Sequence, residues 1–213
     1  MRADAHISIA RAVVRDGTLT RHVAHRFDAG RAYAVATGLG MPRTWGISTS
    51  AVLAGFEHGL EENRGVEPSE RLKRAVSRAR ATLAEHCDRL VERILPDATL
   101  VALLLAETHL HVMSVGPGRV YVQRAGRPQR LTAREESNIG ILRARPSMCA
   151  TPVEPGDLVL AGSVTAFSMS SIAKAMSVLT ADPDTSPAVL ASLLTEPAAK
   201  AGVGAAAVVL RVR

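Results

Sequence analysis

The chain has 213 residues, 47% of them hydrophobic and 22% charged, which is typical of a globular protein large enough for one well-buried core. No stretch reaches the roughly 20 apolar residues that a membrane-spanning helix needs, because Glu107 and histidines soon follow the apolar run at 100–105. Residues 1–6 carry charges and lead into no apolar signal region. The sequence therefore predicts a cytoplasmic protein without a membrane span or a secretory signal.

Basic residues exceed acidic ones, and the formal net charge is +6. Such a balance raises the possibility of nucleic-acid binding, but aromatic residues are only 3% of the chain, too few for base-stacking platforms. The densest basic cluster lies on a predicted helix with an apolar opposite face, which favours a solvated helix face: Arg71, Lys73, Arg74, Arg78 and Arg80. We expect no nucleic-acid partner, and a basic polyanion-binding module remains an alternative.

The two cysteines, Cys87 and Cys149, lie far apart and outside any Cys-x-x-Cys pattern. This spacing indicates neither a disulfide scaffold nor a zinc site. We expect both to be ordinary thiols.

The first half of the chain alternates between strand and helix patterns. Asp16-Gly17 and Asp28-Ala29-Gly30 separate apolar runs and predict three antiparallel strands joined by hairpins. The runs are 7–14, 19–27 and 32–36. Two long helices follow, at 45–62 and 69–95, since apolar residues recur there every three or four positions.

The second half is again strand-rich, with predicted strands at 98–106, 110–115, 119–123, 129–131, 158–161 and 205–212. Residues 132–155 have no clear period and predict a loop. Ser168 and Ser170 are candidate N-caps for a helix through Leu179, and Ser186-Pro187 opens the last helix. This order predicts an α+β fold in which helices cover antiparallel sheets, as one domain over residues 1–213.

Five phrases, in chain order, resemble motifs of the metal-dependent PPM (type 2C) serine/threonine protein phosphatases. Residues 34–40 (AVATGLG) resemble the family's Val-Ala-Asp-Gly-Met-Gly-Gly, and 97–103 resemble its Gly-Thr-Thr-Ala strand. Residues 115–122 resemble Val-Gly-Asp-Ser-Arg-Ala-Tyr, 155–160 resemble Pro-Gly-Asp-x-Leu-Leu, and 208–212 match the apolar last strand. The resemblance implies a β-sandwich of two antiparallel sheets flanked by helix pairs.

In that family two manganese or magnesium ions activate a water that attacks a phosphate ester, and aspartates hold the ions. The matching positions here are not acidic. Thr37-Gly38 stands for the Asp-Gly pair, Val164 for the Asp of Ser-Asp-Gly, and Gly204 lies where the closing Asp-Asn pair would fall. Pro117 replaces the acid of the Gly-Asp-Ser-Arg hairpin. The resemblance thus implies a degenerate site that needs no metal cofactor and has no catalytic residue.

Other stretches supply no replacement acids. Residues 198–213 contain none, and the first strand pair carries Arg21 and His22 where the family has an acidic motif. We interpret Arg21, His22 and Pro117 as possible remnants of a cleft, and Asp16 and Asp28 as turn residues.

Four histidines are candidate metal ligands. His109 and His111 share a strand face, but no third ligand is evident, and surface positions are favoured over a metal site. His22 and His25 are three apart on a strand and would face opposite ways.

The sequence predicts a catalytically inactive PPM-like protein that binds a signalling partner, either a kinase or a phosphoprotein. A divergent metal-dependent phosphoserine/phosphothreonine phosphatase is the first alternative. The basic polyanion-binding module is the second.

Overall fold

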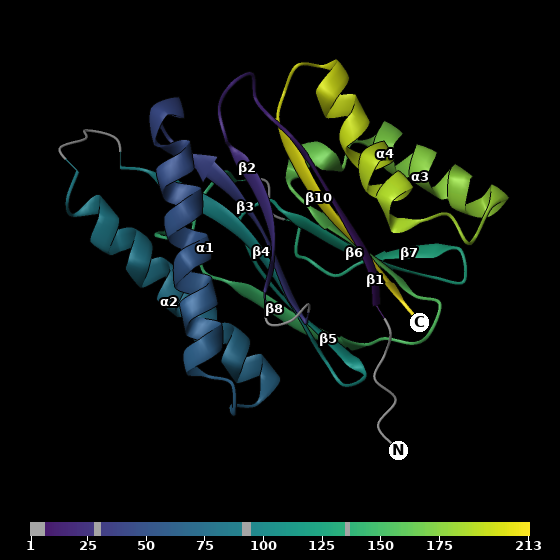
Figure 1. Cartoon of the computed structure of the whole chain (residues 1–213), viewed down its shortest axis with the longest axis horizontal. Helices are drawn as coiled ribbons and strands as arrows, with labels where there is room; N and C mark the ends of the chain where they lie inside the picture. The colour runs from purple at the N-terminus through teal and green to yellow at the C-terminus, as the bar shows by residue number, and fades with distance from the viewer. Residues whose placement is uncertain (1–6, 28–30, 91–94, 135–136) are drawn as a thin grey trace.

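The computed structural model describes residues 7–27, 31–90, 95–134 and 137–213. Two five-stranded antiparallel sheets stack face to face, and a pair of helices covers the outer face of each sheet (Figure 1). The predicted α+β sandwich with flanking helix pairs is confirmed.

The first sheet contains, in spatial order, β1 (Ile7–Val14), β10 (Ala205–Val212), β9 (Leu158–Gly162), β6 (Arg119–Arg124) and β7 (Arg127–Arg130). The second sheet contains β2 (His22–Phe27), β3 (Ala32–Leu39), β4 (Asp97–Ala106), β5 (His109–Val115) and β8 (Ser147–Pro152).

Helices α1 (Trp45–Glu62) and α2 (Pro68–Cys87) cover the second sheet, and α3 (Met169–Ala181) and α4 (Pro187–Lys200) cover the first. Two short 3-10 helices, η2 (Pro42–Thr44) and η3 (Val164–Ala166), follow β3 and β9. The predicted N-caps Ser168 and Ser186 are confirmed, because their side chains accept hydrogen bonds from Ser171 N and Val189 N. Ser170 does not cap a helix.

Alternation along the central strands builds two separate cores. In β3, Tyr33 and Val35 face the other sheet, while Ala34 and Ala36 face helices α1 and α2. Helices α1 and α2 approach closely at Gly59, where an added Cβ would lie 2.6 Å from Ala75 Cα. This tight packing fixes the helix pair, and with it the turn between the two helices.

The predicted hairpin between the first two strands is wrong. β1 pairs with β10 at the edge of the first sheet, whereas β2 pairs with β3 in the second sheet. The turn at Asp16–Leu19 therefore carries the chain from one sheet to the other. β2 also begins later than predicted, at His22.

Two boundaries differ from the predictions. The second helix ends at Cys87 rather than near residue 95, because Arg89 N and Leu90 N donate to carbonyls three residues back, as in a turn. The part of that prediction at 91–94 lies outside the described residues. The predicted loop at 132–155 contains β8, an edge strand that pairs with β5. Its mostly exposed side chains give it no apolar period.

The basic cluster on α2 is not a uniformly solvated face, contrary to the prediction. Lys73 and Arg74 are exposed, but Arg71 is buried and donates from Nε and Nη2 to the Leu60 carbonyl. Arg80 donates to the carbonyls of Ile141 and Ala144. These arginines stabilise the packing of α2. None of the helices in the described ranges is both long and apolar enough to cross a membrane.

Candidate functional site

On each strand, every second side chain faces the space between the two sheets. At one end of the sandwich, the last of these inward-facing side chains are polar or small. Alternation places His22 of β2, Thr37 of β3 and Thr99 of β4 on the interior face of the second sheet. Ser163 and Gly204, next to the ends of β9 and β10, continue the interior rows of the first sheet. We call this group of five residues the candidate-site end.

His22 and Thr37 form the centre of this end. The His22 Nδ1 and Thr37 Oγ1 atoms are 3.0 Å apart, and the His22 side chain is 3% exposed. The second ring nitrogen, Nε2, has no hydrogen-bond partner among the described residues. Burial, and then the nearby Arg21 cation, lower the pKa of His22 to about 4, against a smaller opposing effect of Asp16. The imidazole is therefore neutral at pH 7.

Gly204 leaves the room that the His22 ring occupies. A Cβ at Gly204 would lie 2.6 Å from His22 Cδ2 and 3.1 Å from Nε2. Because real Cβ atoms do not approach other atoms so closely, any larger residue at position 204 requires the ring to move. The histidine and the glycine thus fit each other across the two sheets.

Arg21 lies at the rim of this end. Its guanidinium sits 4.7 Å from the Trp45 ring centroid, its Nε donates to the Gly38 carbonyl, and its Nη1 is 3.7 Å from Asp16 Oδ2. Asp16 opens the turn that leads into β2, as predicted. Asp28 lies outside the described residues.

Two carboxylates near this end are already engaged by the protein. Asp16 pairs with Arg21, and Asp97 Oδ1 accepts hydrogen bonds from Ala98 N and Leu142 N. Burial raises the pKa of Asp97, although these backbone hydrogen bonds oppose the rise.

The donor set at this end does not fit a pair of hard divalent cations. Such ions prefer several carboxylate oxygens, whereas the groups that converge here are a threonine hydroxyl and a neutral imidazole beside an arginine. Within the described ranges, no group of three or more His, Cys, Asp or Glu side chains is arranged to hold a metal ion.

The other predicted site residues lie at the same end but do not all converge. Val164 is exposed in η3, and the preceding Ser163 faces inward instead, accepting a hydrogen bond from Ala206 N. Pro117 is buried in the turn between β5 and β6. Gly38 pairs with Ala98 in the ladder between β3 and β4. Thr99 and Ser163 were not singled out from the sequence, although alternation along their strands indicates inward positions.

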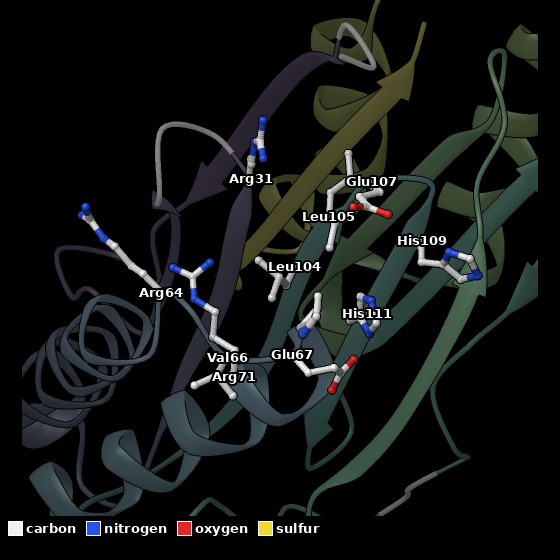
Figure 2. A pocket seen from close by; sticks show the side chains of 12 residues that line it. Arg31, Arg64, Val66, Glu67, Arg71, Leu104, Leu105, Glu107, His109 and His111 are labelled. Atoms are coloured by element: carbon white, nitrogen blue, oxygen red, sulfur yellow. The ribbon is translucent and has the colours of Figure 1, made fainter. Parts of the chain in front are cut away.

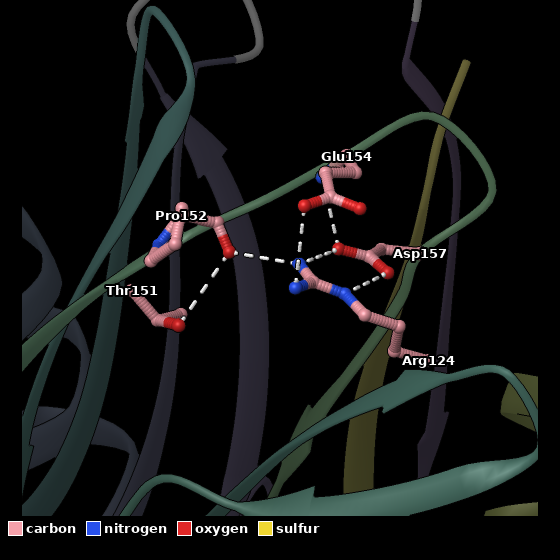
Figure 3. Close-up of polar contacts among 5 residues, drawn as sticks. All are labelled: Arg124, Thr151, Pro152, Glu154 and Asp157. Carbon is pink, nitrogen blue, oxygen red and sulfur yellow. Dashed lines mark hydrogen bonds and ion pairs between the residues drawn. The ribbon is translucent and has the colours of Figure 1, made fainter.

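The opposite end of the sandwich carries an ion pair between a buried aspartate and an exposed arginine. Asp157, 2% exposed, accepts hydrogen bonds from Arg124 Nε and Nη2 at 2.9 and 2.6 Å (Figure 3). Arg124 Nη2 also donates to the Pro152 carbonyl, and Glu154 N donates to Asp157 Oδ2. The aspartate of the Pro-Gly-Asp phrase therefore lies far from the candidate-site end and holds Arg124, which also reaches β8 of the other sheet.

His111 lies at this opposite end too, and it is not the surface residue that was predicted. It is 8% exposed, and its Nδ1 lies 2.9 Å from Ser69 Oγ on α2. Burial lowers the pKa of His111, partly offset by Glu67. His109 is exposed, with its ring centroid 6.4 Å from that of His111. His22 and His25 face opposite ways, as predicted.

No family model matches the chain, and no curated protein sequence matches it significantly. Solved structures do match. The serine/threonine phosphatase PstP of Mycobacterium tuberculosis is similar with a TM-score of 0.81 at 20% identity, over 97% of this chain and 99% of that one. A serine/threonine phosphatase of S. agalactiae gives 0.80 at 16% identity, over 98% and 99%. PppA of Pseudomonas aeruginosa gives 0.73 at 17% identity, over 98% and 100%.

These similarities establish that the chain has the PPM phosphatase fold, which the sequence motifs predicted. The PstP catalytic domain has been solved with two manganese ions. At this level of identity the similarity shows the fold, and the chemistry of the present chain depends on its own residues.

Proposed function

We propose that this chain is a single-domain, cytoplasmic protein of the PPM fold that does not hydrolyse phosphate esters and acts by binding a kinase or a phosphoprotein. The observation that carries the proposal is the position of His22. Its ring fills the space beside Thr37 and Gly204, two of the positions aligned with the family's metal-binding acids.

The chemistry at this end argues against an activated water. Two dications close together require carboxylates to offset their charge, and a metal is what lowers the pKa of a bound water enough to form a nucleophile at neutral pH. Here the Arg21 cation would repel a dication, and both Asp16 and Asp97 are engaged by the protein.

Exposed apolar side chains support binding of a protein partner at the same end. Val164 follows Ser163, Val203 precedes Gly204, and Leu19 lies in the turn before Arg21; all three are exposed. Exposed apolar surface rimmed by polar residues is typical of interaction sites, and these three side chains supply apolar surface at this end. PppA, which has the same fold, is described as a key regulatory component of a type VI secretion system, which is compatible with a regulatory role here.

Metal titration tests the loss of catalysis. We expect no saturable heat when manganese is titrated into the protein, and no manganese-dependent turnover of p-nitrophenyl phosphate, with the PstP catalytic domain as the positive control. Tight manganese binding together with metal-dependent turnover would instead establish the alternative, a divergent phosphatase.

Surface variants test the binding role. We expect Val164→Glu and Val203→Glu to abolish capture of a phosphorylation-pathway protein from cell extract. Val189→Glu, an exposed valine on α4, is the matched control and should retain capture. If all three variants capture the same proteins as the wild type, binding at the candidate-site end is wrong.

A further inference from the structure

A pocket of about 450 Å³ lies at the end of the sandwich opposite the candidate site. It is formed between the turn that joins α1 to α2 and the turn that joins β4 to β5. Figure 2 shows Arg31, Arg64 and Arg71 on one side of the pocket, and His109 and His111 on the other.

The three arginines come from three different segments of the chain. Arg71 is held rigidly in the wall, since its side chain is 8% exposed and donates twice to the Leu60 carbonyl, at 3.0 and 2.8 Å. Arg64 is largely exposed, and Glu61 Oε1 lies at 4.0 Å from its Nη2. Arg31 directly precedes β3. Planar guanidinium groups of this kind match the geometry of phosphate oxygens.

The N-terminus of α2 and the ring of His111 add further groups that can bind an anion. The 20-residue helix α2 begins here, so the positive end of its dipole faces the pocket. His111 uses Nδ1 for Ser69 Oγ, and its side chain lines the pocket, so Nε2 is the ring nitrogen that can meet a ligand. The buried imidazole therefore retains one nitrogen for a ligand.

The charge of the lining is positive even with both histidines neutral, because three arginines face two glutamates. One of these glutamates, Glu67, is engaged as the N-cap of α2, with its carboxylate accepting from Glu70 N at 3.0 Å. The other, Glu107, is exposed in the turn between β4 and β5. Neither carboxylate forms an ion pair with Arg64.

We propose that this pocket binds a phosphomonoester group, held by Arg31, Arg64 and Arg71 and by the ring of His111. Its volume admits a phosphate group with several attached atoms. The inference goes beyond the proposed function and does not depend on it, because the pocket and the candidate-site end lie at opposite ends of the sandwich.

Calorimetric titration with inorganic phosphate and with phosphoserine tests the site. We expect saturable binding that Arg64→Gln and Arg31→Gln each weaken by about tenfold, since each removes a charge-assisted hydrogen-bond donor. Arg74→Gln is the matched control: this exposed arginine lies on the same helix, less than one turn from Arg71, outside the pocket. Its affinity should equal that of the wild type.

Amide chemical shifts locate the bound anion. We expect phosphate to shift residues 64–71 and 104–111 and to leave the fluorescence of Trp45, at the candidate-site end, unchanged. Absence of saturable binding, an equal loss in Arg74→Gln, or shifts confined to residues 37–41 would each overturn the proposal.

A phosphoserine-containing peptide, compared with the same peptide unphosphorylated, identifies the source of the group. Tighter binding than free phosphoserine assigns the pocket to a phosphorylated protein segment, and equal binding assigns it to a small phosphorylated molecule. These results are independent of the manganese titration, so either proposal can fail while the other stands.

Discussion

The two ends of the sandwich handle polar groups in opposite ways. At the candidate-site end, the buried polar side chains are uncharged, namely a neutral histidine, two threonines and a serine, and the imidazole packs against Gly204. At the other end, a buried aspartate pairs with Arg124, and three more arginines line a pocket. A buried charge is thus retained where an arginine pairs with it, whereas uncharged side chains pack against each other at the candidate-site end.

The ion pair should show the largest effect on stability. Asp157→Ala leaves Arg124 without its main partner and Glu154 N without its side-chain acceptor, so we expect a loss of about 2–3 kcal/mol in the free energy of unfolding. Urea denaturation measures this loss. Glu154→Gln is the control, since its exposed carboxylate is 3.5 Å from Arg124 and should contribute less than about 1 kcal/mol. Equal losses in the two variants would contradict the structural role of Asp157.

The packing of His22 against Gly204 can be tested by substituting either residue. Gly204→Ala places a Cβ 2.6 Å from the ring, and we expect roughly 1–3 kcal/mol of destabilisation from overpacking. In a His22→Ala background the same substitution should cost at least about 1 kcal/mol less, because the ring is gone. Some cost remains, since the Asp16 backbone nitrogen lies 3.2 Å from that Cβ position. An identical cost in both backgrounds would show that the ring does not fill this space.

The pH dependence of stability probes the buried imidazole. The unfolded chain protonates His22 below about pH 6.5, whereas the folded protein does so only below a pKa of about 4. Between these values the unfolded state binds the extra proton, so stability falls as the pH falls. We expect a contribution of about 2 kcal/mol to be lost between about pH 7.5 and about pH 5.

Urea denaturation at both pH values, compared with His22→Asn, isolates this contribution. His25→Asn is the matched control, because His25 lies on the same strand but is exposed. If His22→Asn keeps the pH dependence of the wild type, the imidazole is not held neutral by the fold.

The sequence predicted most helices and strands because helix periods, N-cap serines and strand alternation are local signals, and the resemblance to the PPM family then implied the sandwich. The prediction of strand pairing was wrong where one local signal is compatible with two topologies. Asp16-Gly17 marks a turn whether the flanking strands pair or, as here, enter different sheets. β8 escaped prediction because an edge strand with mostly exposed side chains needs no apolar alternation.

The sites were predicted in part, for a similar reason. Thr37, His22 and Gly204 were all named from the motifs, yet their mutual contact joins positions at both ends of the chain and has no local signal. The pocket at the opposite end was missed because Ser69 and His111, which meet there, are 42 residues apart.

Substitution of Arg21 should have the smallest effect on stability. Its cation lies over Trp45, an interaction worth about 0.5–1 kcal/mol at exposed sites, and its ion pair with Asp16 adds little. Arg21→Gln should therefore lower stability by about 0.5–1 kcal/mol and shift the emission of Trp45, the only tryptophan of the chain. Arg15→Gln, an exposed arginine at the same turn, should do neither.

The same Arg21→Gln substitution should also raise the pKa of His22, because the Arg21 charge is the second cause, after burial, that lowers it. The pH at which stability begins to fall is set by the unfolded chain and should not move, whereas the total loss at low pH should shrink. An unchanged loss, together with an unchanged Trp45 emission, would mean that Arg21 does not act on the candidate-site end. The neutrality of His22 would then rest on burial alone.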